Sequence, residues 1–224
     1  MVFLYSLTYG QDSKFAVGFT VTPTITSLKG AIKPPISFNN GYDQTTVFYG
    51  SQYRFSAGLS VEYFICKHLS VKSGLAYERK GAQTYRYPMD DVIDGYWPPN
   101  NMDKKMNFDY LTIPILGSFS TKGKIKFYMD AGIFLGFLVS QKDLIAADGS
   151  NPERIDDNYA TVRKLDFGLS LGLGLKIPLS NKLLLDFGLC NNTGLININK
   201  TYLSNDEVLR TGSNGLQIGL KYRL

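Results

Sequence analysis

The stretch Arg163–Ile177, RKLDFGLSLGLGLKI, carries the plainest pattern in the chain. From Leu165 onward every odd position holds Leu, Phe or Ile, and every even position holds Asp, Ser, Gly or Lys. Because a β-strand points alternate side chains to opposite faces, this alternation predicts one long strand with an apolar face and a polar or small face. A helix would scatter the same leucines around its circumference, and each interior Gly would cost it up to about 1 kcal/mol.

The length of this strand is as informative as its alternation. Strands of soluble proteins usually have about 5–6 residues. The steps from Leu165 to Ile177, at roughly 3.3 Å each, cover about 40 Å of chain. Tilted by about 40°, such a strand rises roughly 30 Å, which is the thickness of a bilayer's hydrocarbon core. The apolar stripe is therefore long enough to cross a membrane.

The same alternation recurs along the chain, and its spacing predicts the whole fold. The connections between the expected strands alternate between long loops (25–51, 81–105, 141–158 and 193–212) and tight turns (65–68, 121–124 and 178–181). Eight strands with this spacing predict an all-β, antiparallel, up-and-down transmembrane barrel of the bacterial outer membrane. Four long loops then lie outside, and the short turns and both termini face the periplasm. The expected strands cover residues 14–24, 52–64, 69–80, 107–120, 125–140, 163–177, 182–192 and 214–224.

Two kinds of eight-stranded barrel compete at this point, and they differ in where the bulky residues point. A lipocalin-like soluble carrier needs apolar side chains inside to hold a small apolar ligand. A narrow membrane barrel is filled by its inner side chains and is apolar outside. The face opposite the leucines carries many Gly residues and charges of both signs, and Lys or Arg in mid-membrane costs about 2–4 kcal/mol. The pattern favours the membrane barrel, with the lipocalin-like carrier as the alternative.

Charged residues of both signs therefore lie on the face that we expect to line the bore. A buried charge is tolerated when it is paired and hydrogen-bonded, so acids and bases in a narrow bore are expected to pair. Such a network either lines a polar channel or closes the barrel, and the width of an eight-stranded barrel favours closure without an open pore. The expected interior charges are Arg54, Glu62, Lys72, Glu78, Lys126, Asp130, Lys164, Asp166, Lys176, Asp186, Lys221 and Arg223.

Composition supports this class and excludes others. No run approaches the 18 apolar residues of a transmembrane helix, the longest in the expected strands being 131–139. The net charge is +5, but the Lys and Arg residues are dispersed among acids, which argues against nucleic-acid binding.

Residues 1–10 resemble the remnant of a signal peptide, and residues 11–224 are expected to form a single barrel domain. Cys66 and Cys190 are expected to lie too far apart for a disulfide.

The search for catalytic chemistry finds little. Enzymes among small barrels commonly use a His as general base near the outer rim. The one histidine, His68, lies in an expected periplasmic turn beside Cys66, where no third group would orient a nucleophile. No Gly-rich phosphate loop opens a helix and no His/Cys cluster has metal-ligand spacing. We therefore expect no enzyme, no catalytic residues, no cofactor and no metal.

The external loop 84–100 concentrates aromatic residues among acids and prolines. Its rigid aromatic side chains are candidates for binding a protein partner or a glycan. The alternative is that they pack within the loop or lie at the lipid–water interface. The acids do not have the spacing of a calcium loop. The candidate contact residues are Tyr85, Tyr87, Tyr96 and Trp97.

Three segments together resemble the PorT-like outer-membrane β-barrel family: NFDYLTIPILGSF (107–119), GLSVEYFICKHLSVKSGLAYERKG (58–81) and GLQIGLKYRL (215–224). The resemblance covers nearly the whole mature chain, and its most specific part is the YLTIP-type strand that follows a tyrosine-rich loop. The C-terminal strand also resembles a barrel-assembly signal, with Tyr222 and Leu220 at alternate positions and Leu224 in place of the usual final Phe.

Membership of that family implies an integral outer-membrane protein without general catalytic residues. Some relatives are linked to secretion or to surface-protein maturation. The expected partners are therefore outer-membrane lipid, the barrel-assembly machinery through the C-terminal strand, and a secretion-system or extracellular partner through the long loops. We expect a structural, binding or secretion-accessory protein.

Overall fold

The computed structural model describes residues 14–30, 45–88, 104–145, 154–157, 159–200 and 208–224. These residues form one antiparallel sheet and a single 3-10 turn, η1 (Tyr159–Thr161). No helix among them is long and apolar enough to span a membrane. The strands are β1 (Phe15–Lys29), β2 (Thr45–Gly50), β3 (Gln52–Phe64), β4 (Leu69–Pro88), β5 (Lys104–Ser120), β6 (Lys126–Ile145), β7 (Arg154–Asp157), β8 (Leu165–Pro178), β9 (Leu183–Gly194) and β10 (Arg210–Arg223).

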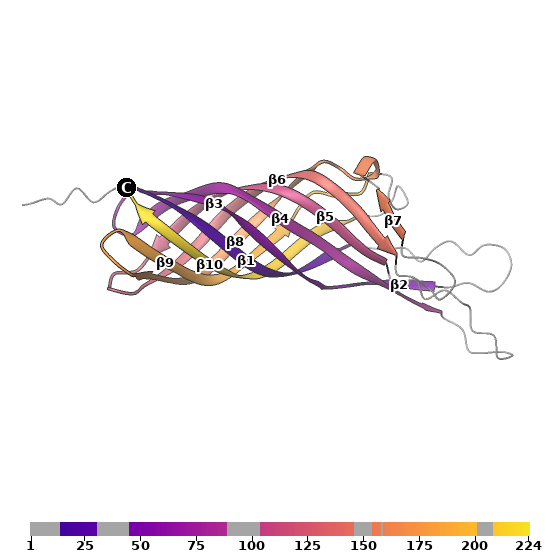
Figure 1. Ribbon diagram of the computed structural model, residues 1–224, viewed down its shortest axis with the longest axis horizontal. Helices are drawn as coiled ribbons and strands as arrows, with labels where there is room; N and C mark the ends of the chain where they lie inside the picture. Colours follow the sequence, from indigo (N-terminus) through magenta and orange to yellow (C-terminus); the bar gives the residue numbers. More distant parts are fainter. Residues whose placement is uncertain (1–13, 31–44, 89–103, 146–153, 158, 201–207) are drawn as a thin grey trace, which may run out of the picture.

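Eight of these strands close into a barrel (Figure 1). Each pairs antiparallel with its neighbours in the order β1-β3-β4-β5-β6-β8-β9-β10, and β10 returns to β1. The two short strands β2 and β7 extend the sheet at β4 and β6. Tight turns and the C-terminus lie at one end of the cylinder, which we call the turn end, and the long connections lie at the other, the loop end. The predicted eight-stranded, up-and-down topology is confirmed.

The two faces of the sheet are divided as the alternation predicts. Along β8 the leucines point outward, from Leu165 at 42% exposure to Leu173 at 60%, whereas Asp166 and Lys176 are buried inside. The interior also holds Tyr128 and Phe134, which fit because the facing positions are Gly. A Cβ added to Gly174 would lie 2.9 Å from the Tyr128 ring. With the aliphatic side chains outside, the lipocalin-like alternative is not supported.

Hydrogen-bonded pairs of polar side chains mark the limit of the apolar outer surface, the apolar belt, toward the loop end. Arg79 Nε donates to Asp109 Oδ1 at 2.6 Å on the outer face, and Asn191 Nδ2 donates to Oδ1 of the exposed Asn214 at 2.7 Å. From Leu69 at the turn end to Arg79, at roughly 3.3 Å per residue and a tilt of about 40°, β4 rises about 25 Å. This is the height of the apolar band of outer-membrane barrels.

Tyrosine and phenylalanine flank this belt, as is typical of the lipid–water interface. Tyr53 is 83% exposed and Phe127 is 66% exposed, and both lie on the outer face near strand ends.

Six of the eight barrel strands run further toward the loop end than the sequence predicts, and β3 and β8 do not. β1 continues to Lys29 and β10 begins at Arg210, because alternation is kept there by Thr24, Thr26 and Thr211, which face the bore. Polar β-branched residues are an ambiguous signal for a strand, which explains the shorter prediction. The expected remnant of a signal peptide, residues 1–10, lies outside the described residues.

Pro114 lies within β5, and the ladder between β4 and β5 is interrupted beside it. Ser73 pairs with Ile115 and Ala76 pairs with Thr112, without pairs between them. Proline has no N–H to donate to a ladder, which explains the irregular pairing at this position.

Candidate functional site

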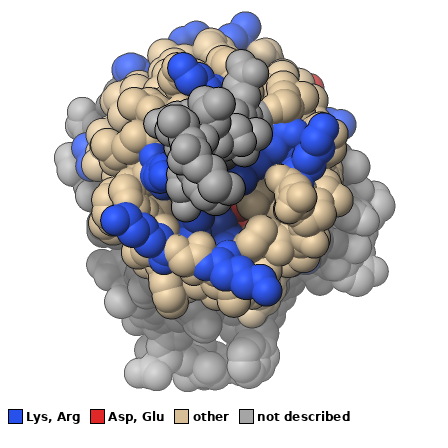
Figure 2. Space-filling view, turned by 90° about the vertical axis from the view of Figure 1, so that its left-hand side faces the viewer, with Lys and Arg blue, Asp and Glu red and all other residues tan. Residues whose placement is uncertain are grey.

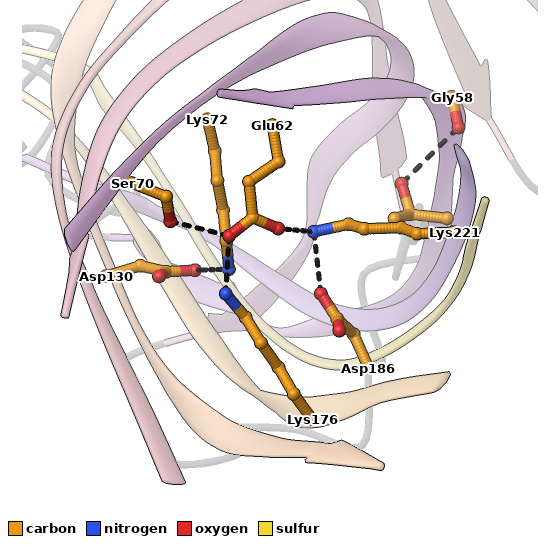
Figure 3. A network of polar contacts seen from close by, with 9 residues as sticks. Gly58, Glu62, Ser70, Lys72, Asp130, Lys176, Asp186 and Lys221 are labelled. Atoms are coloured by element: carbon orange, nitrogen blue, oxygen red, sulfur yellow. Dashed lines mark hydrogen bonds and ion pairs between the residues drawn. The ribbon is translucent and has the colours of Figure 1, made fainter. Parts of the chain in front are cut away.

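Seven interior side chains form one polar network toward the turn end, and we call it the turn-side cluster (Figure 3). Glu62, which is fully buried, lies at its centre. Its Oε1 accepts a hydrogen bond from Ser70 Oγ at 2.6 Å and contacts Lys176 Nζ. The members are Glu62, Ser70, Lys72, Asp130, Lys176, Asp186 and Lys221.

The remaining contacts complete the charge balance of this cluster. Lys221 Nζ lies 2.8 Å from Glu62 Oε2 and 2.6 Å from Asp186 Oδ2. Lys72 Nζ donates to Asp130 Oδ2 at 2.7 Å. Three lysines thus face three carboxylates, and the cluster is neutral. Since six of the eight barrel strands contribute (β3, β4, β6, β8, β9 and β10), its ion pairs tie together strands that do not adjoin in the sheet.

An aromatic ring contacts the cluster inside the bore. Lys72 Nζ lies 4.0 Å from the centroid of the Tyr128 ring and Lys176 Nζ lies 5.6 Å from it. Cation–π contacts of desolvated ammonium groups stabilise by about 2 kcal/mol. Tyr128 therefore adds to the stability of the cluster and fills part of the bore beside it.

A second network, the loop-side cluster, surrounds Lys80, which is fully buried. Lys80 Nζ lies 3.0 Å from Asp166 Oδ2 and 3.7 Å from Glu78 Oε2, and it lies over the Phe134 ring at 4.2 Å. Hydroxyl and amide groups satisfy the carboxylates: Thr211 Oγ1 donates to Asp166 Oδ2 at 2.6 Å. Ser213 Oγ and Asn192 Nδ2 donate to Glu78 Oε1 at 2.7 and 3.3 Å.

An apolar plug lies beyond this second cluster, at the loop end. Ile198 and Val162 come from segments outside the barrel strands, which are joined by the bridge Val162↔Asn199. Both are buried against inward-facing apolar residues of the barrel wall. The plug consists of Leu28, Ala82, Met106, Phe108, Tyr110, Leu138, Val162, Ile198 and Leu209, with Tyr159 packed against it.

Between the two charge clusters the bore keeps a cavity of about 110 Å³. At about 30 Å³ per water molecule it has room for a few waters. Lys72, Glu78 and Asp130 line it. Two ion-paired layers and one apolar layer therefore fill the barrel on either side of a small polar cavity.

The structure brings together most of the predicted interior charges, but it places four elsewhere. Lys164 is exposed, which corrects its expected place in the network: it precedes β8 at the loop end, where the bore is apolar, and its Nζ lies 5.0 Å from the Tyr159 centroid. Arg54 is half-buried and donates to Asn107 Oδ1 at 2.5 Å. Arg223 and Lys126 are half-buried at the turn-end mouth.

Sequence reasoning missed Lys80 and the apolar plug. Lys80 follows Glu78 by two positions, so alternation points it inward, but the expected strand ends at this residue. Nothing local distinguishes Ile198 or Val162 from ordinary loop residues, because their burial depends on a chain segment folding back over the barrel.

The residues weighed for catalysis have structural contacts. His68 is half-buried, its Nδ1 donates to the Ser120 carbonyl at 2.8 Å, and its ring stacks on Phe119. Cys66 is exposed, Cys190 is half-buried, and both are free thiols, as expected. Within the described ranges, no group of three or more His, Cys, Asp or Glu residues is arranged to hold a metal.

The four candidate loop contacts cannot be placed in this site. Tyr96 and Trp97 lie outside the described residues, and Tyr85 and Tyr87 are described as part of β4 by their backbone alone.

Solved structures of surface and outer membrane proteins are similar to this chain. Neisserial surface protein A has 17% sequence identity and a TM-score of 0.45, with 95% of this chain and 98% of that chain covered. The outer membrane protein OprG from Pseudomonas aeruginosa has 12% identity and a TM-score of 0.47, covering 96% and 99%. A major outer membrane protein from Thermus thermophilus has 14% identity and a TM-score of 0.45, covering 92% and 99%. At such identities nothing about a ligand is transferred to this chain.

A search among curated proteins finds no significant match. The family model described as "Outer membrane protein beta-barrel domain" matches residues 9–200, which is most of the chain. An outer-membrane barrel contacts lipid through its outer face, as the exposed leucines of β8 do. The chain therefore belongs to the outer membrane protein β-barrel domain family.

Proposed function

We propose that the protein is a closed, non-enzymatic barrel of the outer membrane that presents its external loops for binding, and that it conducts no ions or solutes. The observation that supports closure is the filling of the bore by the turn-side cluster, the loop-side cluster and the apolar plug. A permeating ion would have to break buried pairs such as Lys80–Asp166, and breaking a buried pair costs about 3–5 kcal/mol.

Planar-bilayer recording tests the closed state. The purified, refolded protein is expected to produce no discrete conductance steps. A double variant that shortens two bore residues, Lys80→Ala with Asp166→Ala, is the matched comparison, because it widens the loop-side layer and removes both partners of one ion pair together. Regular ohmic steps from the wild-type barrel would contradict the proposal.

The binding role is assigned to loop 84–100, with Tyr85, Tyr87, Tyr96 and Trp97 as its contact residues. This assignment is supported by the concentration of rigid aromatics in a segment that starts at the loop end of β4. Site-specific photo-cross-linking in cells tests it: a photoreactive residue at Trp97 is expected to capture a protein or glycan partner. The same residue at the lipid-facing Leu173 serves as the control, and equal capture from both positions would refute the assignment.

The resemblance of residues 58–81, 107–119 and 215–224 to PorT-like barrels favours a second candidate, that of a secretion accessory. In that case the turn end faces the periplasm together with both termini, and β10 serves as the signal read by the barrel-assembly machinery. Cross-linking followed by co-purification tests for a bound secretion complex. Substitutions in loop 84–100 and substitutions in the turns at the turn end are compared, and the set that abolishes co-purification identifies the end that binds the complex. Loss of the gene without any effect on secreted proteins would refute this candidate.

A further inference from the structure

The turn end of the barrel opens into a hollow of about 930 Å³, and we call it the basic vestibule. It lies inside the ring of tight turns and ends at the turn-side cluster, because Lys176 and Ser70 belong to its lining. Figure 2 looks into this opening and shows Lys and Arg side chains around most of its rim. The vestibule is therefore a pocket with a closed bottom.

The lining of the vestibule is strongly one-sided in charge. Eight of its 21 residues are Lys or Arg, and none of these described lining residues is Asp or Glu. The chain has 24 Lys and Arg in total, so a third of them gather at this one opening. Inside the opening, acidic surface is visible only at the bottom (Figure 2). The rim cations are Lys14, Lys67, Lys122, Lys124, Lys182 and Arg223.

Local structure holds several of these cations at the mouth. Gly123 has a φ of +131°, which L side chains rarely adopt, and the turn that it permits holds Lys122 and Lys124, on either side of it, at the rim. The Arg223 guanidinium lies 5.6 Å from the Phe64 ring centroid. Its Nε is buried and has no hydrogen-bond partner among the described residues.

Like charges around one opening repel one another. Salt at physiological strength screens this repulsion fully only beyond a Debye length of about 8 Å. A multivalent anion in the middle removes this repulsion. Lysine binds phosphate as a compact point charge, and ligand pockets of about 300–1,000 Å³ hold small molecules. The closed bottom excludes a chain that would thread through the bore.

We propose that the basic vestibule binds a compact anion carrying two or more phosphate groups, either as a free molecule or as the headgroup of an anionic phospholipid. The rim lysines and the Arg223 guanidinium supply the attraction. This site lies at the opposite end of the barrel from the external loops, so it does not depend on their role.

The test uses the full refolded chain and tripolyphosphate as the probe. Isothermal titration in a zwitterionic detergent is expected to show saturable, one-to-one binding that weakens as salt increases. The quadruple variant Lys14→Gln, Lys122→Gln, Lys124→Gln, Lys182→Gln is expected to bind about tenfold more weakly or worse, because it removes four of the six rim cations. The control Lys29→Gln, Lys142→Gln, Lys164→Gln, Lys200→Gln makes the same charge change at exposed positions away from the vestibule.

A heat-modifiability gel is expected to show that both variants fold, because all eight changed positions are exposed. In nanodiscs, the enrichment of cardiolipin over phosphatidylcholine around the protein is measured. If the wild type and the control variant enrich cardiolipin and the vestibule variant does not, the anion is a lipid headgroup. Tripolyphosphate binding in detergent without that enrichment would identify a free phosphate compound. The proposal is overturned if neither probe binds, if both quadruple variants weaken binding equally, or if a Glu-rich peptide binds more tightly than tripolyphosphate.

Discussion

Replacing Glu62 by Gln tests whether the turn-side cluster holds the barrel together. Glutamine has nearly the same shape and still accepts the hydrogen bond from Ser70 Oγ, which is 2.6 Å long in the wild type. The change leaves three lysines facing two carboxylates. Lys221 keeps Asp186 at 2.6 Å, whereas Lys176 loses the carboxylate with which it is paired.

The magnitude follows from burial. Glu62 is 0% exposed and Lys176 is 4% exposed, so the pair is largely desolvated. Leaving a buried charge without its partner costs about 3–5 kcal/mol. With an m-value of about 2 kcal/mol/M in urea, the midpoint of unfolding falls by about 2 M.

Unfolding in urea, followed by the band shift between folded and boiled protein on a gel, measures this change. Asp109→Asn is the matched control, because it removes a carboxylate of similar geometry from the partly exposed outer pair with Arg79. Exposed pairs contribute about 0–1 kcal/mol, so the control is expected to change little. The double variant Glu62→Gln, Lys176→Gln restores neutrality and is expected to recover part of the loss. A Glu62→Gln midpoint no lower than that of the control would refute the reasoning.

Three further outcomes are expected from the same barrel. Leu173→Arg puts a charge on the outer face in mid-membrane and is expected to destabilise the barrel by about 2–4 kcal/mol in lipid unfolding assays, more than in detergent. Gly188→Ala brings a methyl group against the Tyr128 hydroxyl and within 2.5 Å of the Leu173 carbonyl oxygen and is expected to lower the urea midpoint; an unchanged midpoint would show that both the ring and the neighbouring strand move aside. Exposed Cys66, in a Cys190→Ser background, is expected to react with a 5-kDa maleimide only after the outer membrane is permeabilised; labelling in intact cells would contradict the expectation that the turn end faces the periplasm.

The sequence alone determined the strands and their faces. Residues such as Asp166, Lys176 and Asp186 were assigned to the bore because the two-residue period of an extended backbone is a local property, and each neighbour fixes the direction of the next side chain. The same reasoning placed the leucines of 165–177 in lipid. It failed at Lys164, because alternation indicates a direction but does not show whether a residue still lies within the wall.

Only the tertiary structure decided which charges meet. Lys221 reaches Glu62 across 159 residues of sequence, and Lys80 reaches Asp166 across 86. Such partners depend on the stagger between neighbouring strands, which sets the height of each residue along the barrel axis. The apolar plug around Ile198 and the gathering of cations at the turn end have the same origin. The two-residue period of the backbone determines which face of the sheet each side chain occupies, but closure of the sheet determines which other side chains it contacts.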